Sequence, residues 1–277
     1  MKRIDAHQHF WQYDPIKDDW ITTGMEVIRR DFMPQDLWPL LAQNKIDGCI
    51  AVQASQSEAE TAFLLKLASE HDFILGVVGW TDLRAPDLEE KLKVYSNEKK
   101  LKGFRHILQT EDLRSFLADG RFARGLAILE DSPFTYDFLV YHHQLKEILP
   151  IARRFPTARF VLDHLGKPDL KSGEIKQWKA DLIALGGLPN VYCKLSGLVT
   201  EGDWAHWQPS GLAPYLDGCM EAFGTARLLF GSDWPVCLLA TSYSQWLSVL
   251  ESHFDRLTSK EKAQIFGGNA ARFYRIE

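Results

Sequence analysis

Two histidines stand one residue apart near the start of the chain, in the stretch DAHQHFW. On a β-strand successive side chains point to opposite faces, so we expect Asp5, His7 and His9 to share one face and Ile4 and Ala6 to lie on the other. Paired imidazoles at this spacing suit a divalent metal or a polar substrate. A surface strand with two exposed histidines would explain the stretch equally well, so the rest of the chain has to decide.

Histidines and other polar residues recur at the ends of short apolar segments. Six of the nine histidines lie at such ends: His7, His9, His106, His142, His143 and His164. Further polar residues mark the ends of other segments of this kind: Gln53, Asp82, Arg105, Lys194, Ser196 and Asp233. Enzymes built on parallel barrels carry their chemistry at the C-terminal ends of the strands. The distribution therefore predicts one polar cluster at the mouth of a barrel.

The residue types in this cluster indicate its chemistry. Three imidazoles and one carboxylate form a donor set for one divalent cation: His7, His9, His164 and Asp233. Asp233 can also act as a general base toward water. Arg105 has a planar donor fork that suits substrate oxygens, although a structural ion pair is the alternative. For Lys194 the alternative is a lysine inside the barrel that pairs with a carboxylate. Three tryptophans could close the pocket and stack on a ring, or simply pack at the barrel rim: Trp11, Trp80 and Trp234.

The elements that must position these residues alternate along the chain. Eight strand-like segments lie at 2–10, 48–55, 73–80, 101–108, 135–143, 158–166, 190–197 and 226–234. Helical apolar spacing appears at 57–71, 86–96, 143–156 and 242–254, and Ser57 with Glu60 forms the pattern of a capping box. This alternation predicts a parallel α/β sheet, closed as a (β/α)8 TIM barrel in one domain over 1–277. A doubly wound open sheet is the alternative, but no GxGxxG or P-loop motif supports it.

Composition limits the classes of partner. The 277 residues carry a net charge of −5 with mixed signs along the chain, which argues against nucleic acid and anionic membranes. No apolar run approaches the roughly 20 residues of a membrane span, and no apolar signal region precedes the first strand. The four scattered cysteines are typical of free thiols in a reducing compartment. These features predict a cytoplasmic protein.

Several stretches resemble the amidohydrolase superfamily. DAHQHF is similar to its first-strand HxH motif, VLDHLGKP to its later-strand histidine motif, LLFGSDWP to its strand-eight aspartate motif and IFGGNAARFY to its C-terminal helix. Together with LKGFRHILQ, they resemble the branch of sugar lactonases that act on L-fuconolactone or L-rhamnonolactone, which is related to the pyrone-dicarboxylate lactonases. The motifs span nearly the whole chain in the expected order.

The resemblance implies a (β/α)8 fold and hydrolysis by an activated water, with His7, His9, His164 and Asp233 at the metal or water site. Binuclear members use a lysine or glutamate after strand four, where this chain has Arg105 and His106. The resemblance thus implies at most one divalent metal, with zinc the expected identity. Because related pyrone-dicarboxylate enzymes work without an essential metal, a metal-independent reaction is the alternative. His142 matches the strand-five histidine, with its neighbour His143 as the other choice.

The leading hypothesis is hydrolysis of a sugar-derived lactone, a small-molecule substrate. Asp233 and His164 are the expected catalytic residues. The expected substrate-binding residues are Arg105, His106, His142, Trp11, Trp80 and Trp234. Metal-dependent decarboxylation of an unsaturated acid is one alternative, and a non-catalytic sugar-binding barrel, which the intact Asp233 disfavours, is another. The sequence is compatible with a homodimer but does not determine the oligomeric state.

Overall fold

Eight parallel strands form the centre of the molecule. The computed structural model describes residues 1–276, and its strands pair strictly in sequence order, from β1 to β8. The strands are β1 Ile4–Gln8, β2 Gly48–Val52, β3 Ile74–Gly79, β4 Leu101–His106, β5 Thr135–Phe138, β6 Phe160–Leu162, β7 Val191–Leu195 and β8 Leu228–Phe230. Each strand falls inside one of the eight segments predicted from the sequence.

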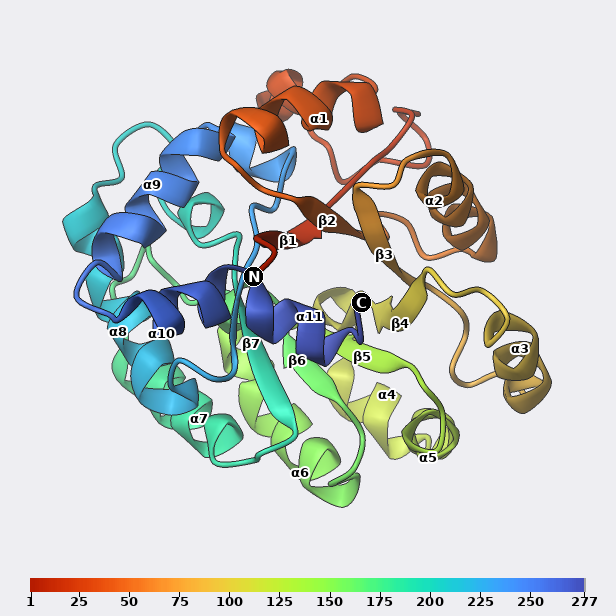
Figure 1. Ribbon diagram of the computed structural model, residues 1–277. Coiled ribbons are helices and arrows are strands. Elements are labelled where there is room, and N and C mark those ends of the chain that lie inside the picture. Colours follow the sequence, from red (N-terminus) through yellow and green to blue (C-terminus); the bar gives the residue numbers. More distant parts are fainter. Residues whose placement is uncertain (277) are drawn as a thin grey trace.

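The sheet closes on itself through the residues that follow β1 and β8. The amide of His9 donates to the carbonyl of Trp234 at 2.7 Å, and the amide of Asp233 donates to the carbonyl of His7 at 2.8 Å. These bonds complete a ring of strands with helices around it (Figure 1). The predicted (β/α)8 barrel is confirmed, and its seam joins two segments expected to carry the chemistry.

The helices surround the barrel and close one of its ends. They are α1 Pro34–Gln43, α2 Glu58–Glu70, α3 Leu88–Tyr95, α4 Leu113–Ala118, α5 Arg121–Glu130, α6 Leu145–Arg154, α7 Lys176–Gly186, α8 Pro209–Phe223, α9 Tyr243–His253, α10 Ser259–Ala263 and α11 Asn269–Phe273. The four helices predicted by apolar spacing are confirmed as α2, α3, α6 and α9. Within residues 1–276, no helix has both the length and the apolarity needed to cross a bilayer.

The capping box predicted for α2 forms only in part. The hydroxyl of Ser57 accepts the amide of Glu60 at 3.1 Å, as expected for an N-cap. The Glu60 side chain does not return to Ser57, because it accepts the amide of Ala54 at 3.1 Å instead. Glu60 is buried, and it therefore ties the loop after β2 to the helix that follows.

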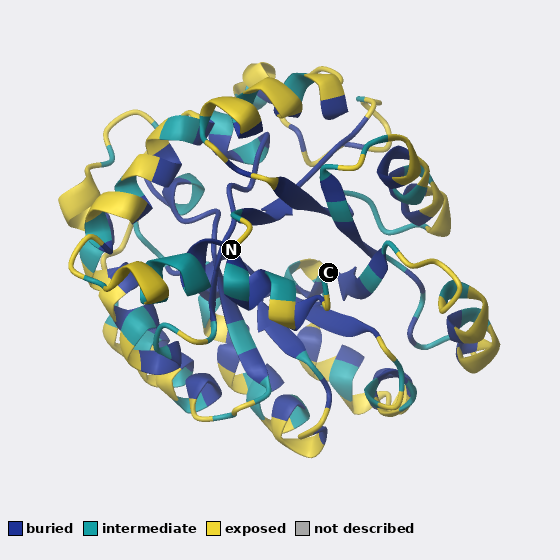
Figure 2. Cartoon of the chain, in the orientation of Figure 1, coloured by how far each residue is buried: buried dark blue, intermediate teal, exposed yellow. Residues whose placement is uncertain are grey.

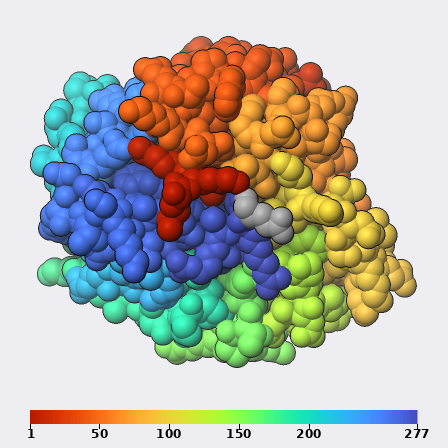
Figure 3. Space-filling view, in the orientation of Figure 1, coloured from red at the N-terminus to blue at the C-terminus, as the bar shows by residue number. Residues whose placement is uncertain are grey.

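Alternating side chains divide the apolar core into two layers. The inner layer lies within the barrel and includes Ile50, Val52 and Val78, which pack toward Phe273 and Tyr274 near the C-terminus. Nearly all strand residues are buried, whereas the surrounding helices expose their outer faces (Figure 2). The N-terminal residues and the C-terminal segment fill the near end of the barrel (Figure 3). The opposite end, where the strands finish, is left to hold the site.

The prediction that His7 and His9 share one face is confirmed, but the placement of Asp5 on that same face is wrong. The pairing of β1 with β2 shifts register between Asp5 and Gln8. Ile4 and Ala6 pack in the inner layer, while Asp5 accepts the amide of Ser232 at 2.9 Å. The irregularity allows His7 to face the interior without Asp5. Burial raises the pKa of the Asp5 carboxyl to about 6.

Candidate active site

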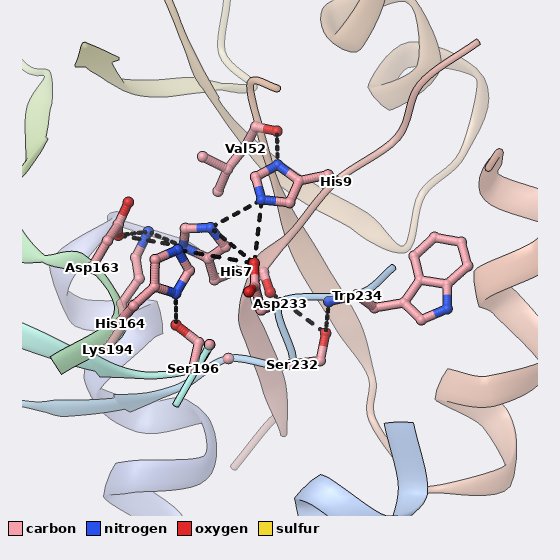
Figure 4. A network of polar contacts seen from close by, with 12 residues as sticks. His7, His9, Val52, Asp163, His164, Lys194, Ser196, Ser232, Asp233 and Trp234 are labelled. Atoms are coloured by element: carbon pink, nitrogen blue, oxygen red, sulfur yellow. Dashed lines mark hydrogen bonds and ion pairs between the residues drawn. The ribbon is translucent and has the colours of Figure 1, made fainter. Parts of the chain in front are cut away.

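Three imidazoles surround the carboxylate of Asp233 at the C-terminal end of the barrel. One carboxylate oxygen, Oδ1, lies 3.4 Å from Nε2 of His9, 3.8 Å from Nε2 of His7 and 3.9 Å from Nε2 of His164. Nε2 of His7 also lies 3.2 Å from Nε2 of His9. Figure 4 shows these rings converging from β1 and from the segment after β6. The structure thus brings together the four residues expected to form the metal or water site.

Two of these residues adopt strained backbone conformations. His164 has φ 53° and Asp233 has φ 57°, both in the left-handed region that L-residues rarely occupy. Such strain persists only where the surroundings impose it, and it concentrates at functional sites. Both residues lie within three positions of the end of a short strand, so the turn out of the barrel points their side chains back over its mouth.

Polar contacts on the far side of each ring fix its orientation. Nδ1 of His9 lies 2.8 Å from the carbonyl of Val52, which can only accept, so that nitrogen carries the proton. Nδ1 of His164 contacts the hydroxyl of Ser196 at 3.0 Å, and Nδ1 of His7 lies 3.3 Å from Oδ1 of Asp163. Partners of this kind are typical of histidines that use Nε2 as a ligand atom.

A buried charged network lies beneath the imidazoles. Asp163 is bonded to Arg105 at 3.0 Å and to Lys194 at 2.9 Å, and Lys194 also pairs with Asp137. Tyr274, beside the helix that closes the barrel floor, donates to Asp137 at 3.2 Å. Lys194 therefore has the structural role that was its alternative interpretation. Two cations and two carboxylates balance one another where an isolated charge would be very costly.

The surroundings of Asp233 and His164 shift the pKa values of both side chains downward. Burial would raise the pKa of Asp233, but the nearby imidazoles of His164 and His9 outweigh it and hold that pKa well below its usual range. Burial lowers the pKa of His164 to about 4. At neutral pH the site therefore presents an ionised carboxylate beside a neutral imidazole. This combination can bind a cation or accept a proton.

The donor set fits one divalent cation. Ligand atoms from His7, His164 and Asp233 all lie within 4.8 Å of one another, and all three residues are buried. Donors around a tetrahedral zinc ion are separated by about 3.3 Å, close to the 3.2–3.9 Å separations that the site shows. His9 lies beside this trio and is oriented toward it. A modest contraction would bring these atoms to ligand distance.

A cavity of about 380 Å³ opens above the site. His9, His164 and Asp233 form part of its lining, together with Arg105 and Trp11. Nη1 of Arg105 binds Asp163, which confirms the structural ion pair, and Arg105 also borders the cavity; its contact with substrate stays a prediction. The cavity also reaches residues that sequence reasoning missed: Lys17, Trp20, Gln56, Gln109, Lys167 and Thr200.

Four residues expected to bind substrate lie outside the cavity lining: His106, Trp80, Trp234 and His142. Nδ1 of His106 faces the indole N–H of Trp80 at 3.3 Å, and its Nε2 contacts Glu111 at 2.8 Å, so these side chains satisfy one another outside the described cavity lining. The Trp234 ring is buried, with its centroid 5.2 Å from that of Phe32.

The two histidines after β5 also lie outside the cavity lining. Nδ1 of His142 lies 3.1 Å from the carbonyl of Lys167. His143 stacks on Tyr141, with ring centroids 5.7 Å apart. His142 is therefore the one of the two that contacts a cavity-lining residue, through its backbone.

The closed parallel barrel carries histidines and an aspartate at its C-terminal mouth. This combination is typical of (β/α)8 enzymes that hold a metal or activate a water. The chain belongs to the amidohydrolase family, whose profile matches residues 4–276. The match covers every strand and every residue of the site.

Two relatives share the full extent of the chain. An L-fucono-1,5-lactonase of Burkholderia multivorans is 45% identical, across 99% of this chain and 96% of the relative. An L-fucono-1,5-lactonase of Burkholderia ambifaria is 38% identical over the same shares. A crystal structure of a Burkholderia multivorans amidohydrolase with bound zinc is 44% identical, covers 100% of both chains and superimposes with a TM-score of 0.97.

Proposed function

We propose that the protein hydrolyses a sugar-derived lactone of the L-fuconolactone or L-rhamnonolactone type, as part of carbohydrate metabolism. The observation that carries the proposal is the position of the Asp233 carboxylate among three imidazoles, in the lining of a cavity large enough for a small sugar ring. The full-length similarity to two L-fucono-1,5-lactonases supports the choice of substrate class.

In the proposed reaction Asp233 takes a proton from water as the water oxygen bonds to the lactone carbonyl carbon. The carbonyl oxygen gains the negative charge, and Arg105, a fixed cation that borders the cavity, would stabilise it. The bond from the carbonyl carbon to the ring oxygen then breaks, and Asp233 returns its proton to that oxygen. The product is the open-chain hydroxy acid, so the aspartate ends the cycle ionised again.

We further propose one divalent cation per chain, with zinc the expected identity. His7, His164 and Asp233 would hold it, with His9 beside them. A bound cation supplies Lewis acidity, which polarises the carbonyl and makes the attacking water more acidic. Elemental analysis of protein purified without added metal tests the stoichiometry, and two equivalents would contradict a single site. Full activity after chelation, with no metal left by the same analysis, would remove the cation from the mechanism.

A pH-indicator screen of aldonolactones tests the reaction itself, because each turnover releases one acid. The screen should include L-fucono-1,5-lactone, an L-rhamnonolactone and a D-gluconolactone. We expect the two L-sugar lactones to be hydrolysed with the highest kcat/KM. Release of carbon dioxide from an unsaturated carboxylic acid, without lactone turnover, would favour a decarboxylase instead.

A lactone is the only partner that the proposed reaction requires. The four cysteines are buried free thiols, as expected from their spacing. A cytoplasmic location and a homodimer both stay predictions. Fractionation of the source cells tests the location, and light scattering coupled to size-exclusion chromatography tests the assembly.

A further inference from the structure

The segment after β6 contains an unusual left-handed turn. His164, Leu165, Gly166 and Lys167 have φ values of 53°, 57°, 69° and 46°. The amide of Lys167 donates to the carbonyl of His164 at 2.7 Å, which closes the turn. L-residues visit this conformation singly, because each one brings its Cβ against the following carbonyl oxygen. Three non-glycine residues within four positions therefore indicate a strongly imposed geometry.

The turn is held in place by its surroundings. The indole N–H of Trp178 donates to the carbonyl of Leu165 at 2.8 Å, and Nδ1 of His142 donates to the carbonyl of Lys167 at 3.1 Å. Because both partners bind backbone atoms, they fix the path of the chain whatever the side chain at residue 167. His142 is thus a positioning residue, which acts on the cavity through Lys167.

The result of this geometry is that two side chains three residues apart border the same cavity. His164 and Lys167 both belong to its lining. The Lys167 ammonium lies 3.1 Å from Oε1 of Glu201 and 5.5 Å from the centroid of the Tyr141 ring. Only 18% of the lysine side chain is exposed. The cation is therefore held at the barrel mouth by residues that follow β5 and β7.

A structural ion pair does not account for this arrangement. The Lys167–Glu201 pair is partly exposed to solvent, and such pairs contribute little to stability. A strained turn that only created this pair would lose more than it gains. Strain of this kind is typical of sites where a side chain must reach a ligand.

We propose that Lys167 binds hydroxyl oxygens of the sugar lactone and so selects polyhydroxylated substrates. This inference rests on the proposed lactonase function. The ammonium has three N–H donors and no acceptor, and Glu201 occupies one direction, so the others can serve substrate oxygens. Arg105 borders the same cavity as a second cation.

The test compares two lactones that share the reacting ring ester but differ in hydroxyl groups. L-fucono-1,5-lactone carries hydroxyls, whereas δ-valerolactone carries none. For Lys167→Met we expect kcat/KM on the sugar lactone to fall at least about 10-fold, mainly through KM, as for the loss of a hydrogen bond to a charged group. On δ-valerolactone, kcat/KM should stay at the parent value. Lys167→Arg should recover part of the loss.

A second variant separates binding from folding. Lys167→Gly removes the side chain and also relieves the left-handed strain, so its melting temperature should equal or exceed that of the parent while sugar-lactone activity falls. A structural role for the lysine predicts a lower melting temperature instead. Lys171→Met, an exposed lysine in the next loop, is the matched control and should behave as the parent on both substrates.

Each outcome discriminates between the ideas. Equal losses on both lactones, or no loss on the sugar lactone, would overturn the role of Lys167 and leave the lactonase proposal intact. A parent enzyme that turns over no sugar lactone would overturn the proposed function and the inference with it.

Discussion

Replacing Gly197 by alanine should damage the site far more than the size of a methyl group suggests. This glycine follows β7 with φ +62°, and an added Cβ would lie 2.4 Å from Nδ1 of His164 and 3.0 Å from Oδ2 of Asp233. Real Cβ atoms do not approach other atoms so closely, so the His164 ring must move. Its hydrogen bond to Ser196, now 3.0 Å long, would then break.

The expected cost can be worked out in parts. A left-handed alanine costs about 1–2 kcal/mol, and the broken hydrogen bond about 0.5–1.5 kcal/mol. Together these lower the melting temperature by roughly 3–14 °C for a chain of this size. A displacement of a catalytic group by about 1 Å can cost roughly 100-fold in rate. We therefore expect kcat/KM for L-fucono-1,5-lactone to fall about 100-fold.

Gly120 provides a matched control. It precedes α5 with φ +75°, and an added Cβ there would meet nothing within 4 Å. Gly120→Ala should thus show the conformational cost of about 1–2 kcal/mol with parent activity. Thermal unfolding and initial-rate kinetics on both variants separate strain from collision. Parent-like kinetics for Gly197→Ala, or equal losses of activity in the two variants, would refute this account of the site.

Three further substitutions test other parts of the site. Asp233→Asn should lower kcat at least about 100-fold with little change in melting temperature; near-parent turnover would show that another group activates the water. Arg105→Met should lower the free energy of unfolding by about 3–5 kcal/mol, because it leaves buried Asp163 with one cation fewer, and activity should fall as well; urea denaturation with unchanged stability would contradict this. Ser196→Ala should lower activity or metal affinity roughly 10-fold, because it releases the His164 ring. If kinetics and metal titration give the parent values for this variant, Ser196 does not orient His164.

Much of the fold was predictable because its signals are local. Short apolar runs and helical spacing determine where strands and helices form, and strict alternation of the two types favours a barrel. Convergence of His7, His9, His164 and Asp233 was predictable for a topological reason, since the ends of parallel strands meet at one mouth. These inferences needed no knowledge of loops.

The remaining features depend on contacts between distant segments. The face of β1 that carries Asp5 is decided by a register shift against β2, which the residues of β1 alone do not reveal. The His106 side chain contacts Trp80 and Glu111 and does not line the cavity. Lys17 and Gln56 reach the cavity from loops whose shape no periodicity determines. Only Lys167 carried a signal, since it lies in the HLGKP stretch beside His164.

The rigidity of the site follows from how the barrel interior is filled. An apolar interior would leave the His7 ring free to turn, whereas here Asp163 and Lys194 contact its Nδ1 at 3.3 and 3.1 Å. Asp163 is in turn bonded to Arg105, and Lys194 pairs with Asp137. Removal of any one charged group would leave the network with a net charge that nothing balances, in a region without exposed surface. The charged groups that pair with one another also orient His7 and Arg105. The stability of the barrel interior and the geometry of the barrel mouth therefore depend on the same contacts.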